Sequence, residues 1–96
     1  MIDVEFSGRA LLDVDRLVDF LMQADPTVAL ATATILFEAI NVLKHSPEIG
    51  RTTKSVFREL IVSRGRTGYV VLYRYVSEQS RVLIVAIRHQ REVGYK

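Results

Sequence analysis

The sequence predicts an α+β fold in which an N-terminal strand is followed by an antiparallel helical hairpin and then a three-stranded antiparallel meander. Three observations predict it. Residues 2–7 alternate between apolar and polar side chains, residues 10–43 carry apolar side chains at helical spacing, and residues 57–89 contain three apolar runs with two short polar breaks. With 96 residues, we expect residues 1–96 to form a single domain.

The N-terminal segment has the period-two alternation of a strand with one buried face. Ile2, Val4 and Phe6 are its apolar residues, and acidic or polar residues lie between them. Ser7 follows the strand and predicts the start of a helix, because a serine hydroxyl can accept a hydrogen bond from a first-turn backbone N–H.

Two helices are predicted before Pro47, which ends the second. Asp25 and Pro26 separate them, as a capping aspartate followed by a proline at the first helical position. The second helix extends to about Lys44, and its wider apolar stripe predicts the more buried helix of the pair. The stripe of the first helix consists of Ala10, Val14, Leu17, Val18 and Leu21, and that of the second of Val28, Ala31, Ile35, Leu36, Ala39, Ile40 and Leu43.

The meander is predicted from three apolar runs, with a polar loop at residues 50–55 before it. The runs are residues 57–62, 68–76 and 81–89, linked by hairpins at 64–68 and 77–80. Strict alternation along the third run sets Val82, Ile84 and Ala86 on one face and Leu83, Val85 and Ile87 on the other. Both faces are therefore apolar, although an uncovered antiparallel face is usually polar. We expect the C-terminal tail or a partner chain to cover the face that the helices leave open.

Charge is distributed unevenly along the chain. Residues 1–46 hold three basic and seven acidic residues, a balance of −4, whereas residues 47–96 hold ten basic and four acidic residues, a balance of +6. This asymmetry suggests that the basic half faces an anionic partner, and chance variation among solvated side chains explains it equally well.

The sequence indicates a cytoplasmic protein. It has no cysteine, which is consistent with a reducing compartment, and its acidic N-terminus does not resemble a signal peptide. The longest apolar stretch, residues 28–43, contains polar residues and is shorter than the roughly 20 residues of a membrane span.

No metal, cofactor or nucleophilic chemistry is predicted. His45 and His89 are far apart in the sequence, and neither lies in a cluster of carboxylates. Ser55 and Ser63 lack a neighbouring base, and the chain has no glycine-rich phosphate loop.

What remains is a set of arginines on or just after the predicted strands, whose guanidinium groups match phosphate geometry. These are Arg58, Arg74, Arg88 and Arg91. Together with His89 and Tyr95, they could hold RNA and move a proton. The alternative is structural: the first two arginines pair with Glu59 or Glu78 across strands, and Tyr95 near the chain end is disordered.

The ordered set of motifs resembles the RelE/ParE superfamily of bacterial type II toxin–antitoxin (plasmid stabilization) toxins. The matching segments are Leu43, Pro47 and residues 50–51, then residues 58–62, 68–74 and 82–91. The resemblance covers the whole chain in element order, with its specific motifs in residues 43–95. It implies a small toxin inactivated by a cognate antitoxin that wraps a helix or an extended segment over the hairpin and sheet.

The resemblance implies two possible targets. RelE-like members cleave mRNA in the ribosomal A site and carry an arginine after the Gly-Tyr pair, where this chain has Val70. Arg58 alone matches their basic strand, since a second lysine would fall near Leu60, while His89 and Tyr95 resemble their C-terminal histidine or tyrosine. These departures favour the ParE-like branch, which poisons DNA gyrase.

Three hypotheses follow from the residues and the resemblance. The first is a ParE-like toxin that binds gyrase without catalysis, with Arg74, Arg88 and Arg91 as target-binding residues. The second is a ribosome-dependent mRNA endonuclease with Arg58, Arg88, His89 and Tyr95 as catalytic residues. The third is a relic or small binding module that retains only partner binding, and on any of them we expect an oligomer with the antitoxin or with a second copy.

Overall fold

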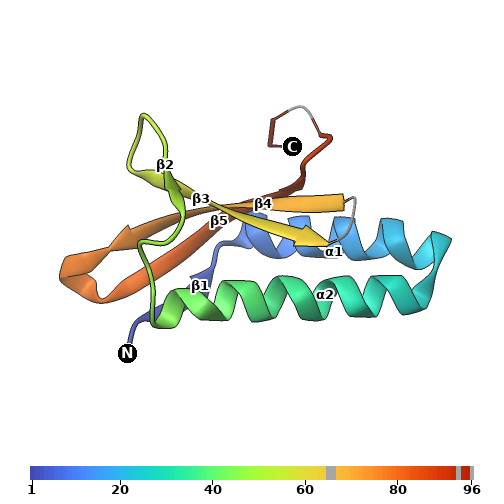
Figure 1. Ribbon diagram of the computed structural model, residues 1–96, viewed down its shortest axis with the longest axis horizontal. Coiled ribbons are helices and arrows are strands. Elements are labelled where there is room, and N and C mark those ends of the chain that lie inside the picture. Colours follow the sequence, from blue (N-terminus) through green and yellow to red (C-terminus); the bar gives the residue numbers. More distant parts are fainter. Residues whose placement is uncertain (65–66, 93, 96) are drawn as a thin grey trace.

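The computed structural model describes residues 1–64, 67–92 and 94–95, arranged as a sheet with a helical hairpin packed on one face (Figure 1). In chain order the elements are β1 (Asp3–Phe6), α1 (Gly8–Ala24), α2 (Pro26–Asn41), a 3-10 turn (Val42–Lys44), β2 (Arg51–Thr52), β3 (Phe57–Arg64), β4 (Thr67–Val76), a 3-10 turn (Ser77–Gln79) and β5 (Arg81–His89). The predicted α+β order is confirmed. Gly65 and Arg66 of the predicted first hairpin link lie outside the described residues.

Both predicted helix starts are present. The Ser7 hydroxyl accepts the Ala10 N–H at 3.0 Å, and the Asp25 carboxylate accepts the Thr27 N–H at 3.0 Å. The Asp25 N–H also donates to the Leu21 carbonyl at 2.7 Å, so this residue closes α1 and begins α2. A one-residue connection leaves the two helices antiparallel, as expected.

The sheet has the order β1-β5-β4-β3-β2, with β1 parallel to β5 and all other pairs antiparallel. The first strand therefore lies at one edge, and the meander fills the centre. At the other edge Arg51 pairs with Glu59, so the predicted polar loop at residues 50–55 is wrong in part. Two residues are too short for a periodic pattern, and only their partner strand makes them a strand.

A β-bulge interrupts the ladder between β4 and β5. Leu72 pairs with Ala86 and Tyr73 pairs with Ile84, so Val85 is an extra residue in β5. Bulges of this kind reverse the facing of every residue that follows them.

The bulge overturns the strict alternation predicted for this strand. Ile87 joins the core under the helices, whereas Ala86 lies on the opposite face with Leu72, its partner in β4. Beyond Ile87 the alternation continues, so His89 faces the helices and Arg88 faces away from them.

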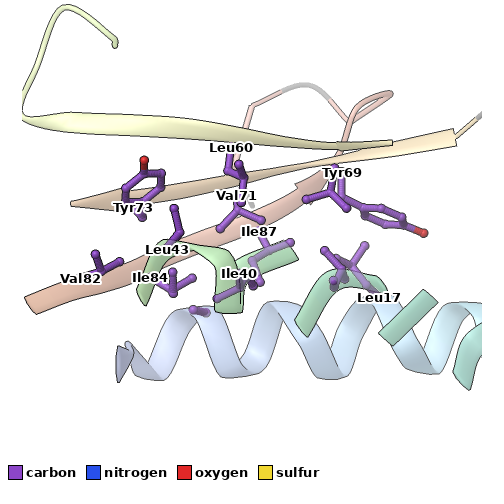
Figure 2. Packing of buried hydrophobic residues seen from close by; sticks show 13 residues of the cluster. Leu17, Ile40, Leu43, Leu60, Tyr69, Val71, Tyr73, Val82, Ile84 and Ile87 are labelled. Carbon is purple, nitrogen blue, oxygen red and sulfur yellow. The ribbon is translucent and has the colours of Figure 1, made fainter. Parts of the chain in front are cut away.

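The core lies between the helices and the sheet and draws on every large element (Figure 2). Its buried residues are Ala10, Leu17, Leu36, Ile40, Leu43, Leu60, Val62, Tyr69, Val71, Tyr73, Val82, Ile84 and Ile87. Leu36, Ile40 and Leu43 come from the predicted stripe of the second helix. By length and composition alone the segment Pro26–Lys44 could cross a membrane, which is weak evidence because core helices of soluble proteins pass the same test.

The sheet face opposite the helices, here called the open face, is covered in part by the C-terminal segment. Val70 lies on this face and is only 2% exposed, and Tyr95 reaches across to Glu59 on β3. Most exposed large apolar side chains lie instead on the helices, namely Leu11, Leu12, Phe20, Met22, Leu30 and Phe37. The apolar surface available to a partner is thus mainly helical.

Candidate functional site

Three side chains meet on the open face, and we call Glu59, Arg88 and Tyr95 the open-face cluster. The Tyr95 hydroxyl donates a hydrogen bond of 2.7 Å to Glu59 Oε2. The Arg88 guanidinium carbon lies 5.2 Å from the centre of the Tyr95 ring, in cation–π geometry. The cluster therefore joins the C-terminal segment to β3 and β5.

Arg88 holds the turn that follows β5. Its Nη1 donates to the carbonyl oxygens of His89, Gln90 and Glu92 at 3.3, 3.4 and 3.2 Å. Its Nε is buried, with no hydrogen-bond partner among the described residues. The guanidinium is thus largely occupied with carbonyls of its own chain.

The electrostatics of the cluster favour a neutral phenol beside a charged carboxylate. Burial, then the hydrogen bond and charge of Glu59, raise the pKa of Tyr95 to about 12. The Tyr95 hydrogen bond, reinforced by Arg51, lowers the pKa of Glu59 despite its desolvation. A phenol in this state is a poor general base at neutral pH, and the carboxylate repels a phosphate.

Arg58 lies on the helix-facing side of the sheet and anchors the preceding loop. Its Nη1 donates to the carbonyl oxygens of Glu48 and Gly50, both at 3.0 Å, and its Nη2 lies 3.6 Å from the Glu48 carboxylate. Beside it, the Tyr73 hydroxyl donates to the Pro47 carbonyl at 2.8 Å and accepts the Gly50 N–H at 2.9 Å. Arg58 therefore pairs with Glu48 and not with Glu59 or Glu78.

His89 also faces the helices, at the other end of the sheet. Its ring meets the Tyr69 ring edge-on, with 5.3 Å between centres. Its Nδ1 accepts the Arg91 N–H at 3.0 Å, and its backbone N–H donates to Glu92 Oε1 at 2.8 Å.

The four predicted nuclease residues occupy three separate places. Arg58 pairs with Tyr73 and His89 with Tyr69, so about four residues of β4, or roughly 13 Å, separate them along the strand. The other two belong to the open-face cluster, on the opposite face. Within residues 1–64, 67–92 and 94–95, no three His, Asp or Glu side chains gather where they could hold a metal ion.

Comparison with known protein families assigns the chain to one of them. A family model described as the ParE toxin of the type II toxin–antitoxin system parDE matches residues 4–94. The protein belongs to this toxin family. Relatives from Caulobacter vibrioides include Toxin RelE1, 33% identical over 86 residues with 90% of each chain covered, and Toxin RelE3, 38% identical over 93 residues with 96% of this chain and 98% of the relative covered.

Solved structures share the fold of this toxin. The chromosomal ParDE system of P. aeruginosa matches with a TM-score of 0.73 and 20% identity, covering 91% of this chain and 94% of that one. The E. coli RelBE toxin–antitoxin complex matches with a TM-score of 0.59 and 19% identity, with the same coverage. The protein is a type II toxin of the RelE/ParE superfamily. The fold predicted from its sequence is confirmed, and it is shared by the matched ParDE and RelBE structures.

The three predicted target-binding arginines of the toxin differ in availability. Arg74 is exposed on the open face, where it pairs with Leu83 across the ladder. Arg91 is exposed in the turn after β5, whereas Arg88 belongs to the open-face cluster. Arg74 and Arg91 therefore present their charge to solvent from opposite ends of the sheet.

Sequence reasoning missed the side chains that hold α1 of the toxin against β5. Past the end of β1, the Ser7 hydroxyl donates to the Val85 carbonyl at 2.9 Å, and Asp13 Oδ2 accepts the Ile87 N–H at 2.8 Å. Arg16 donates to the Ile87 carbonyl at 3.4 Å. The available signal was the position of Asp13, four residues before Leu17 on the apolar stripe.

Proposed function

We propose that this toxin is ParE-like and inhibits DNA gyrase by protein–protein contact, without cleaving RNA. The separation of the candidate nuclease residues carries the proposal. Cleavage at a ribose 2′-hydroxyl needs a base, an acid and a cation that converge on one phosphate. Arg58 and His89 lie at opposite ends of one face, while Arg88 and Tyr95 lie on the other.

The composition of the open-face cluster supports the same proposal. Glu59 adds a negative charge beside Arg88, and the raised pKa of Tyr95 keeps its phenol protonated. Val70, where nuclease relatives carry an arginine, is apolar and buried between β3 and β5. A phosphate backbone would meet one engaged guanidinium and one carboxylate there, which gives little net attraction.

Arg74 and Arg91 are the proposed contacts to gyrase. Both are exposed, and arginine is favoured at protein interfaces because its planar fork pairs with carboxylates and stacks on aromatic rings. Arg88 acts indirectly in this proposal, since it holds the turn from which Arg91 projects.

We propose that a cognate antitoxin neutralises the toxin by covering the helical hairpin. Phe20 is 73% exposed, Leu12 70% and Leu30 66%, which leaves apolar surface that a partner chain would bury. The matched structures are toxin–antitoxin systems, which supports a partner of this kind. The working unit is a cytoplasmic single-domain toxin of residues 1–96 within a hetero-oligomer.

Two parallel assays test the target. Purified toxin is added to gyrase supercoiling reactions with a cleavage-complex readout, and to a purified translation system in which A-site mRNA cuts are mapped. We expect gyrase inhibition that Arg91→Ala and Arg74→Ala weaken and that His89→Ala leaves intact, together with growth arrest and DNA-damage signalling in cells. Arg81→Ala is the matched control, because Arg81 pairs with Glu5 at the β1 edge of the sheet.

The second candidate is a RelE-like mRNA endonuclease, which is favoured by the names of the Caulobacter relatives and by the Arg88–Tyr95 contact. Codon-dependent mRNA cuts that disappear in Arg88→Ala or His89→Ala would overturn the gyrase proposal. A chain that binds its antitoxin but inhibits neither gyrase supercoiling nor translation would instead be a binding module.

A further inference from the structure

A cavity of about 620 Å³ lies between the two helices and the ends of β4 and β5. Its size falls within the roughly 300–1,000 Å³ of small-molecule sites. Apolar walls come from Leu17, Phe20 and Leu21 on α1 and from Val28 on α2. The two hypotheses about the target of the toxin use Arg91 and His89, which line this cavity, but neither gives a role to its apolar interior.

The polar groups of the cavity lie among these apolar walls and at the turn after β5. Thr32 is 3% exposed and Tyr69 4%, so each places a buried polar side chain beside the apolar walls. At the turn, Arg16 and Glu92 form an ion pair of 2.9 Å, which offsets one charge with the other. This pairing leaves the cavity with one surplus cation, Arg91, whose guanidinium forms no ion pair among the described residues.

His89 adds a directed donor next to Arg91. Its Nδ1 accepts the Arg91 backbone N–H at 3.0 Å, so the neutral imidazole carries its proton on Nε2. The ring lines the cavity and is held in place by the edge-on contact with Tyr69. Arg91 and His89 therefore line the same cavity as the apolar walls and bring a guanidinium and an imidazole N–H to it.

We propose that this cavity binds a small amphipathic monocarboxylate, an aliphatic or aryl acid whose apolar part lies between α1 and α2 and whose carboxylate meets Arg91 and His89. The single surplus charge matches a monoanion. A carboxylate accepts two parallel hydrogen bonds from a guanidinium and carries the single negative charge that one surplus cation balances. The apolar walls bury the remainder of the ligand and supply the larger part of the affinity.

Binding is tested with octanoate as the probe, by calorimetry and by amide shift changes near Thr32, Tyr69 and His89. 1-Octanol and octylamine share its chain and differ in the head group. We expect octanoate to bind and to raise the melting temperature by mass action, with both analogues weaker by about tenfold or more. Equal binding of the alcohol would overturn the proposal, because the cavity would then not recognise charge.

Two variants locate the site. Arg91→Gln is expected to weaken octanoate binding about tenfold through loss of a charge-assisted pair. Arg74→Gln, which changes an arginine that is also exposed but lies on the open face, should leave octanoate binding unchanged. Val28→Trp fills the cavity and should abolish binding while far-UV circular dichroism stays that of the parent. Octanoate binding that responds equally to both arginine variants would rule the cavity out, and that comparison stands even if Val28→Trp does not fold.

Discussion

Asp13 accepts the backbone N–H of Ile87 at 2.8 Å, across 74 residues of sequence. The bond exists because β1 ends level with Ile84, and the next segment of β5 has lost its neighbouring strand. Side chains of α1 take over the hydrogen bonds that a longer β1 would have made. The carboxylate is itself 3.6 Å from Arg16 and 3.9 Å from Arg9, so its buried charge is partly compensated.

Asp13→Ala should destabilise the toxin by about 2–4 kcal/mol, because it orphans a buried N–H and removes the partner of two arginines. Asp13→Asn retains an acceptor oxygen and should lose less. Asp15→Ala, on the exposed side of the same helix, is the control. Urea unfolding measures all three, and equal losses for Asp13→Ala and Asp15→Ala would contradict the role given to this bond.

Gly50→Ala should destabilise the toxin by about 1–3 kcal/mol through overpacking. A methyl group at Gly50 would lie 2.6 Å from both Cε1 and the hydroxyl oxygen of Tyr73, a buried ring that cannot move aside. Gly8→Ala is the matched control, since its methyl group meets nothing within 4 Å among the described residues. In the first turn of α1, alanine should be neutral or stabilising. Thermal melts that shift equally for both variants would disprove the predicted clash.

Leu36→Ala should cost about 2–5 kcal/mol, because Leu36 is 2% exposed at the centre of the core. Ile35→Ala should cost less, since Ile35 is only partly buried against the same cluster. Leu30→Ala on the same helix is expected to change stability little, as Leu30 is 66% exposed. If denaturant melts gave Leu30→Ala and Leu36→Ala the same loss in the free energy of unfolding, the burial pattern of α2 would be contradicted.

The Tyr95–Glu59 hydrogen bond makes stability depend on pH at both extremes. The folded state raises the pKa of Tyr95 from 10.0 to about 12, so it holds this proton more tightly than the unfolded chain. That stabilisation is complete below pH 10 and is lost as the pH rises towards 12. The pKa of Glu59 is lowered from 4.5, so its stabilisation is present above pH 4.5 and is lost as the pH falls below that value.

Carbon-13 NMR of labelled tyrosine measures the first of these effects, with Tyr95 assigned from the signal missing in Tyr95→Phe. We expect a midpoint near 12 that falls in Glu59→Gln yet stays above 10, because burial is the largest cause of the shift. Glu48→Gln removes a carboxylate near Arg58 and should leave the midpoint unchanged. An unmoved midpoint in Glu59→Gln would show that the two groups are not bonded in solution.

The isolated toxin should self-associate through its helices. The exposed fraction is 73% for Phe20 and 70% for Leu12 on α1, and 66% for Leu30 on α2, so these side chains form apolar surface that a second copy can bury. Phe20→Gln combined with Leu30→Gln should shift the mass distribution in analytical ultracentrifugation towards monomer. Ile61→Gln, on the open face, serves as the control for exposed apolar surface elsewhere. A monomeric parent chain would refute this expectation.

The sequence predicted the elements that depend on local signals and missed those created by tertiary contacts. Ser7 and Asp25 mark helix starts because a cap is a property of a few neighbouring residues. The β-bulge at Val85 and the two-residue strand β2 exist only through their partner strands. The face on which each candidate site residue lies could not be predicted for the same reason, since a shift of one residue in the ladder decides which face carries each arginine.

The extra residue in β5 has a consequence for how relatives of this toxin are compared. Deleting Val85 would restore strict alternation and leave Arg88 on the open face and His89 towards the helices, because Ile84 and Ala86 already pair with adjacent residues of β4. If Val85 were instead retained as a regular member of the ladder, every residue after it would be reversed, and His89 would face outward and Arg88 inward. Two family members could thus share every aligned residue in this strand and still present opposite chemistry to a target. The presence of the bulge, as much as the composition of the strand, decides whether imidazole or guanidinium reaches the outer surface.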